Sequence, residues 1–186
     1  MSRPVVDPYD MSDAARLPRA AVEWVAAAGR AVLLVHDMGD DKVCAFDAGS
    51  SPMVELAHNV GKLRDTCRDL RVPVAESVRE GVSVFTTVTG LGPDKTLTGD
   101  HYARLRDLLD EAGRDQLIVT GIRAHAACLM AAAGTHLAGI EVFCVADAIA
   151  DLSLDEHRRA VLSAAEYGAM PTTAGRVIGQ LLGVLA

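Results

Sequence analysis

The sequence predicts an α/β fold in which strands and helices alternate along one domain and the strands form a doubly wound, mostly parallel sheet. Residues 31–35 are apolar without a break, which is typical of a strand covered on both faces. Similar apolar runs recur at 117–120 and 140–145, and segments with helical apolar spacing separate them. Half of the residues are hydrophobic but only 4% are aromatic, as expected when Ala, Val and Leu pack helices on a sheet.

The first 30 residues differ from the rest and are interpreted as a lead-in. We expect one domain over 31–186, preceded by this lead-in at 1–30. Short helical pieces are expected within 14–28, and Trp24 could anchor the segment to the body of the protein or to a partner.

The elements of the domain follow from local patterns. Pro52 opens a helix whose apolar residues recur at three- and four-residue intervals, which predicts one buried stripe. The stripe consists of Leu56, Val60, Leu63, Cys67 and Leu70. Strands are expected at 31–36, 72–75, 82–88, 117–120 and 140–145, and a loop at 90–94. Further helices are expected at 102–112, 124–137 and 154–167, and a last one from about residue 172.

One helix start carries a specific signal. Ser153 and Glu156 have the spacing of a capping box before the helix at 154–167. His157 follows this cap and is expected on an exposed or interfacial face of the helix.

Charge and cysteine usage exclude several classes of function. The net charge is −7 and no basic cluster occurs, which argues against a nucleic-acid partner. No apolar run is long enough to span a membrane, and the charged N-terminus has no apolar signal-like stretch. The four cysteines are widely spaced without a CxxC pair, so we expect no metal site. Together with the missing signal-like and membrane-spanning stretches, this predicts a reduced, cytoplasmic protein, and no cofactor is expected.

Two carboxylates follow predicted strands. In open parallel sheets ligands bind beyond the carboxyl ends of the strands, and Asp37 stands at such an end. It could be a general acid or base, or a turn former and helix cap. For Asp147, after the strand at 140–145, we favour a role in holding a loop by hydrogen bonds.

A second candidate segment runs from Thr120 to Cys128. Gly121 permits a sharp turn, and the backbone N–H groups at the start of the next helix could bind an anion. Cys128 could be a nucleophile at a helix N-terminus, but we favour a small buried residue.

Four segments taken together resemble the isochorismatase-like hydrolases. They are 31–38 (AVLLVHDM), 112–121 (AGRDQLIVTG), 124–125 (AH) and 145–158 (VADAIADLSLDEHR). The resemblance covers roughly residues 30 to 170, and it is strongest to the isochorismatases of siderophore and phenazine pathways. It implies a Rossmann-like three-layer α/β/α fold, a homodimer, and hydrolysis of a vinyl ether that releases pyruvate from isochorismate or its 2-amino analogue.

The resemblance also assigns roles. Asp37 matches the Asp that donates a proton to the vinyl ether before water attacks. Amidase members of the superfamily carry a catalytic cysteine where this chain has Ala127, which argues against thiol chemistry. A non-proline cis peptide is implied between Ile122 and Arg123. The residues expected to contact substrate are Arg79, Gly121, Ile122, Arg123, His125 and Ala127.

The chain departs from the family pattern at several site positions. Gly99 stands where the family has an active-site Lys, and Lys95 is displaced from it. Gly39 and Arg79 replace glutamines, and Arg123 replaces a tyrosine that faces substrate. The insertion that covers the substrate is mostly missing.

These departures remove a cation and a lid while adding two arginines. Arg79 and Arg123 near Asp37 could clamp a carboxylate or phenolate in bidentate fashion. They would also favour the ionised form of the Asp37 carboxyl, which suits a base better than an acid.

Three hypotheses about function stay open. The first is an enzyme acting on a small carboxylated or aromatic metabolite of secondary metabolism, with Asp37 as acid or base and Arg79 and Arg123 orienting the anion. The second is a diverged enzyme that performs a cyclisation, isomerisation or dehydration. The third is a non-catalytic scaffold or binding subunit.

Overall fold

The computed structural model describes residues 6–39, 43–80, 83–89, 95–98, 101–125 and 139–185. Seven strands in this part of the chain form one sheet with the order β4-β3-β2-β1-β5-β6-β7. The strands are β1 (Ala31–His36), β2 (Val74–Glu80), β3 (Ser83–Thr89), β4 (Lys95–Thr98), β5 (Gln116–Ile122), β6 (Glu141–Ala150) and β7 (Met170–Thr172). The five neighbouring strands β2, β1, β5, β6 and β7 pair in parallel, whereas β3 and β4 add an antiparallel edge. The expected mostly parallel sheet is confirmed.

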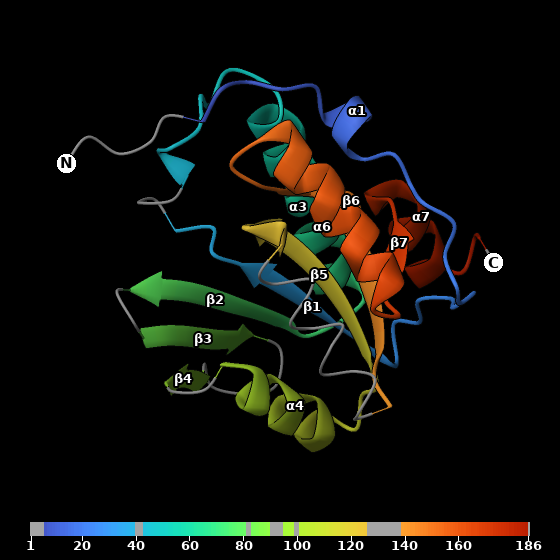
Figure 1. Ribbon diagram of the computed structural model, residues 1–186. Helices are drawn as coiled ribbons and strands as arrows, with labels where there is room; N and C mark the ends of the chain where they lie inside the picture. The colour runs from blue at the N-terminus through green and yellow to red at the C-terminus, as the bar shows by residue number, and fades with distance from the viewer. Residues whose placement is uncertain are drawn as a thin grey trace.

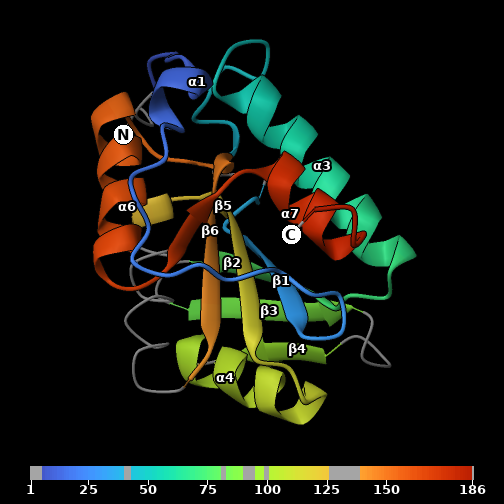
Figure 2. The same ribbon diagram turned by 90° about the vertical axis from the view of Figure 1, so that its right-hand side faces the viewer.

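Helices cover both faces of the sheet (Figure 1). The helices are α1 (Met11–Ala14), α3 (Met53–Asp69), α4 (His101–Ala112), α6 (Leu154–Glu166) and α7 (Ala174–Leu181). Figure 2 shows α3 and α7 on one side of the parallel strands and α6 on the other, and α4 lies along β3 and β4. The expected three-layer α/β/α arrangement is therefore confirmed.

The central strand explains why the core has two halves. All six residues of β1 are buried, because alternate side chains enter opposite helix layers. Leu33 and Val35 pack in the cluster formed with α3 and α7, whereas Val32 and Leu34 pack in the cluster formed with α4 and α6. The run of apolar residues at 31–35 reflects this burial on both faces.

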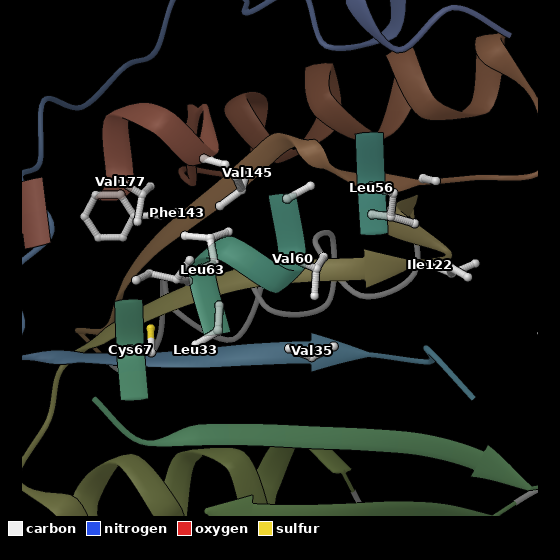
Figure 3. Packing of buried hydrophobic residues seen from close by; sticks show 14 of the residues in the cluster. Leu33, Val35, Leu56, Val60, Leu63, Cys67, Ile122, Phe143, Val145 and Val177 are labelled. Atoms are coloured by element: carbon white, nitrogen blue, oxygen red, sulfur yellow. The ribbon is translucent and has the colours of Figure 1, made fainter. Parts of the chain in front are cut away.

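The apolar stripe of α3 lies over the sheet as the sequence indicates. Figure 3 shows Leu56, Val60, Leu63 and Cys67 from α3 pointing toward the strands. All four are buried, and Leu70 at the end of the stripe is partly buried against the same cluster. The predicted buried face of this helix is confirmed.

Five strands differ from the expectation. β2 continues to Glu80 rather than ending at residue 75, and β4 was not expected. β6 continues through Asp147 to Ala150, and β5 pairs with it across a bulge that shifts the register between Val119 and Gly121. Asp147 lies within the stretch of β6 that bulges between Cys144 and Ile149, so the strand end expected before it was wrong. The unexpected strand β7 contains Pro171, and it lies at the edge of the sheet, where a missing N–H is tolerated.

The expectation of short helical pieces within 14–28 was wrong. Helix α1 ends at Ala14, and the following chain uses its backbone to bind side chains of the body. The N–H of Ala27 donates to Oε1 of Gln116 at 2.8 Å, and the Trp24 ring lies edge-on to Phe143, with centroids 6.2 Å apart. Trp24 therefore anchors the lead-in to the body of the protein. These contacts compete with a helix for the same backbone groups.

Two sequence expectations fall outside the described residues. They are the loop at 90–94 and nearly all of the helix at 124–137. Within the described ranges, no helix combines the length and apolar character needed to cross a membrane.

The buried stripe of α3 gives a direct stability test. Leu63 is fully buried, so Leu63→Ala should lower the free energy of unfolding by about 2–5 kcal/mol. The neighbouring exposed residue gives the control, since Lys62→Ala should stay within about 0.5 kcal/mol of the wild type. Urea denaturation followed by circular dichroism measures both, and equal effects of the two substitutions would contradict the described packing.

Candidate functional site

Asp37 lies directly beyond β1 and is fully buried. Its backbone is in the left-handed region, with φ of 54°, which Asp tolerates better than most residues. Its N–H donates to the carbonyl oxygen of Ser77 in β2 at 2.7 Å. The carboxylate is thus held at the carboxyl end of the central strand, where parallel sheets bind ligands.

Gly121 brings the neighbouring strand β5 against the same strand end. It pairs with His36 and has φ of 115°, and a Cβ atom at this position would lie 2.0 Å from the His36 carbonyl oxygen. Only glycine fits such a close backbone approach. Gly121 lies within β5 and pairs with Ile149 of β6 on its other side, so the turn expected at Gly121 was wrong. The glycine is required instead by the close contact with β1.

His36 and Ser77 form a buried polar pair beside Asp37. The His36 Nδ1 atom lies 2.6 Å from the Ser77 hydroxyl oxygen, and both residues are almost completely buried. Ser77 thus contacts the His36 ring through its side chain and the Asp37 amide through its carbonyl group. Sequence reasoning missed this pair, because its members come from different strands and meet only through the register of β1 and β2.

The segment after Gly121 turns without a cis peptide. Ser51–Pro52 is the one cis bond in the described part of the chain, so the cis bond expected between Ile122 and Arg123 was wrong. The chain reverses instead through a left-handed Arg123, with φ of 60°. Such a conformation costs about 1–2 kcal/mol for a residue with a Cβ atom. The Ile122 side chain is buried in the core with α3 (Figure 3).

A pocket of about 290 Å³ lies where β5 and β6 end and α6 begins. Its lining residues are Arg123, His125, Asp151, Leu152, Glu156 and Arg159. Two of the expected substrate contacts, Arg123 and His125, are therefore brought together. Asp37 is not among these lining residues; it follows β1, the strand that pairs with β5.

The other expected site residues have different outcomes. Arg79 lies in β2 opposite Val84, and only its backbone position is described. Ala127 and Gly99 lie outside the described residues, as does Cys128. Their assignment to the site stays a prediction.

Asp151 links this pocket to the lead-in. Its Oδ2 accepts from the His125 N–H at 2.9 Å, and its Oδ1 accepts from the Leu152 N–H at 3.0 Å. The Tyr9 hydroxyl lies 3.1 Å from both the Asp151 carbonyl oxygen and the Asp151 amide nitrogen. One buried tyrosine from the lead-in thus fixes the backbone of the pocket wall.

His157 is fully buried, so the exposed or interfacial position expected for it was wrong. Its Nε2 lies 2.9 Å from the Ala146 carbonyl oxygen, and its Nδ1 lies 3.1 Å from the Tyr9 hydroxyl. Burial lowers the pKa of His157, and hydrogen bonding to Ala146 opposes this only in part. Both ring nitrogens have partners, which permits a neutral imidazole in the core.

The hydrogen-bonding role expected for Asp147 and the cap expected at Ser153 are confirmed, although Asp147 holds the start of a helix rather than a loop. The Asp147 Oδ1 accepts from the Ala174 N–H at 2.7 Å, which holds the start of α7, and burial raises the pKa of this carboxyl. Ser153 caps α6 by accepting from the Glu156 N–H at 3.2 Å, and its hydroxyl lies 3.4 Å from the Glu156 carboxylate.

The described residues contain no group of three or more His, Cys, Asp or Glu side chains placed to hold a metal ion. Burial raises the pKa of the Cys67 thiol to about 12, which leaves it protonated and unreactive.

The arrangement is that of an α/β domain with a candidate small-molecule site at the carboxyl ends of parallel strands. Residues 31–176 match the sequence model of the Isochorismatase domain. The chain therefore belongs to the isochorismatase family.

Similar proteins agree with this assignment. An isochorismatase of Bacillus subtilis (strain 168) is 35% identical over 210 residues, covering 97% of this chain and 67% of that protein. Enterobactin synthase component B of Escherichia coli (strain K12) is 31% identical, covering 84% of this chain and 65% of that protein. Phenazine biosynthesis protein PhzD1 of Pseudomonas aeruginosa is 32% identical, covering 94% of this chain and 98% of that protein.

Solved structures share the fold at low sequence identity. The MAR1 ribonuclease of Caenorhabditis elegans has a TM-score of 0.65 at 19% identity, covering 86% of this chain and 85% of that chain. An isochorismatase of Pseudomonas putida KT2440 has a TM-score of 0.59 at 16% identity, covering 86% and 98%. The YcaC gene product of Escherichia coli, described as an octameric hydrolase, has a TM-score of 0.56 at 16% identity, covering 87% and 84%.

The contact between Gly121 and His36 is testable by a pair of glycine substitutions. Gly121→Ala should destabilise the fold by about 3 kcal/mol or more, because backbone strain adds to a clash with a main-chain oxygen. Gly61→Ala is the control: this helical glycine has open space around its Cβ position, so the change should be neutral or stabilise by about 0.5–1 kcal/mol. Thermal unfolding measures both, and a Gly121→Ala protein as stable as Gly61→Ala would contradict the described approach.

The buried His157 predicts a pH dependence of stability. Because its pKa is lowered in the folded protein, the unfolded chain binds the proton more readily. The free energy of unfolding should therefore fall as the pH drops from about 7 to about 5, through the unfolded value. In His157→Gln this part of the decline should be missing, although the variant is less stable at pH 7. Urea titrations at several pH values give the two curves, and parallel curves would show that His157 does not titrate as described.

Proposed function

We propose that this protein is an enzyme that acts on a small carboxylated or aromatic metabolite and uses Asp37 to transfer a proton. The observation that carries the proposal is the fully buried Asp37 carboxyl at the end of the central strand, in a chain of the isochorismatase family. Its backbone is fixed by Ser77 and by a left-handed turn. Such a group can deliver a proton in a defined direction.

The reaction that fits this arrangement is hydrolysis of a vinyl ether. The Asp37 carboxyl donates its proton to the terminal methylene carbon, and the adjacent carbon becomes an oxocarbenium ion stabilised by the ether oxygen. Water adds to that carbon, and the Asp37 carboxylate recovers a proton. The resulting hemiketal collapses to pyruvate and an alcohol, so the net reaction consumes one water molecule. Isochorismate and its 2-amino analogue are the substrates that the family resemblance suggests.

Non-hydrolytic chemistry is the second candidate. The Bacillus relative aligns over 210 residues, more than the 186 of this chain, so the relative carries residues that this chain lacks. Gly99 also stands where the family pattern has a Lys. The additional residues of the relative and the missing cation favour a changed substrate for this chain, and they support an isomerisation, cyclisation or dehydration at the Asp37 carboxyl group. A non-catalytic scaffold would keep the fold but would not need Asp37. The expected homodimer stays a prediction.

The assignment of Asp37 predicts a specific loss of activity. Asp37→Asn keeps the size of the side chain and tolerates the left-handed backbone, but an amide cannot donate the required proton. Its pyruvate release from isochorismate or 2-amino-2-deoxyisochorismate should fall by about 100-fold or more. A coupled lactate dehydrogenase assay follows the product.

The matched control is Asp65→Asn, the same chemical change at a side chain that is 68% exposed on α3. It should leave the turnover unchanged. Pyruvate release that survives in Asp37→Asn would refute the role of Asp37. Absence of pyruvate from the wild-type protein would refute hydrolysis of these substrates and favour the second candidate.

A further inference from the structure

Two arginines line the pocket at the ends of β5 and β6 without a hydrogen-bond or ion-pair partner in the described part of the chain. They are Arg123, which is partly buried, and Arg159 on the exposed side of α6. The adjacent Arg158 differs, because it contacts Asp13 of the lead-in through the Asp13 carbonyl oxygen and carboxylate. Both pocket guanidiniums are therefore available to a ligand.

The carboxylates of the same pocket are already engaged by the protein. Each oxygen of the Asp151 carboxylate accepts a backbone N–H, from His125 and from Leu152. The Glu156 carboxylate lies at the cap of α6, 3.4 Å from the Ser153 hydroxyl. These contacts stabilise the local backbone, and they leave the arginines as the groups with unused donors.

The backbone holds Arg123 in an unfavourable conformation at the pocket. Its φ of 60° is rare for a residue with a long side chain, and such strain concentrates at ligand sites. The preceding Ile122 is fixed in the core, and the Asp151 carboxylate fixes the backbone of His125. Arg123 is thus presented to the pocket from a rigid support rather than from a loose loop.

We propose that this pocket binds the carboxylate group of a small metabolite between the guanidiniums of Arg123 and Arg159. Planar guanidinium groups match the two oxygens of a carboxylate, and the volume of about 290 Å³ suits a molecule of metabolite size. We assign this carboxylate to the substrate on which Asp37 acts, and in this respect the site rests on the proposed function. Anion binding itself requires no proton transfer by Asp37.

Binding of a simple probe tests the site without catalysis. Isothermal titration calorimetry at fixed ionic strength measures the binding of three probes. They are malonate as the dicarboxylate, inorganic phosphate as a second anion, and malonamide as the uncharged counterpart of malonate. Malonate should bind and malonamide should not. Arg123→Gln and Arg159→Gln should each weaken malonate binding by about tenfold, because each removes a charge-assisted contact.

The control is Arg68→Gln, which removes an equal charge from an arginine on α3 that is 74% exposed and paired with Asp65. It should bind malonate like the wild type. Arg159 is exposed on a helix, so Arg159→Gln keeps the test valid even if Arg123→Gln fails to fold. Equal binding by wild type, Arg123→Gln and Arg159→Gln would overturn the site, and phosphate binding tighter than malonate would overturn its assignment to carboxylates.

Failure of the site and failure of the proposed function are distinguishable. Asp37→Asn should still bind malonate while losing pyruvate release. Malonate binding that depends on both arginines, together with no pyruvate from the wild type, would retain the anion site and reject the hydrolase. Pyruvate release by the wild type, together with malonate binding that does not depend on the two arginines, would retain the role of Asp37 and reject the anion site.

Discussion

The close approach of Gly121 to the backbone of His36 is the constraint on which the strand-end site depends. β1 and β5 stay in register from Ala31 and Gln116 up to His36 and Gly121, and no side chain fits at Gly121. Beyond that contact both strands leave the sheet through left-handed residues, Asp37 and Arg123. Asp37 and Arg123 therefore lie at the ends of neighbouring strands, each in a left-handed backbone conformation.

The lead-in contacts both the pocket wall and the start of the parallel strands. Its Tyr9 hydroxyl contacts the Asp151 backbone and the ring of His157, so it links the pocket wall to the buried start of α6. Further along, Gln116 at the start of β5 is fully buried and binds the backbone of Val25 and Ala27. The chain before β1 is thus attached at both ends of the parallel strands, which ties the packing of the N-terminal residues to the geometry of the candidate site.

The sequence predicted the features that depend on local burial. The apolar run of β1, the α3 stripe from Leu56 to Cys67, and the cap at Ser153 are confirmed because each follows from spacing along the chain. The continuation of β6 past Asp147 depends on a bulge, and the burial of His157 depends on a carbonyl group of β6. Such features require knowledge of which distant segments meet.

The same limit applies to the site. Asp37 could be singled out because it ends an apolar run, but its neighbour Ser77 comes from the register of another strand. Arg123 could be singled out by resemblance, whereas its pocket neighbour Arg159 comes from α6 across the sheet edge. Hydrolysis of isochorismate in D₂O, with the pyruvate methyl group analysed by proton NMR, shows whether Asp37 delivers the proton to carbon. Proton transfer from Asp37 to the methylene carbon predicts singly deuterated pyruvate from the wild type and none from Asp37→Asn at the same time points. Pyruvate with an undeuterated methyl group, or equal formation by Asp37→Asn, would show that Asp37 does not deliver this proton.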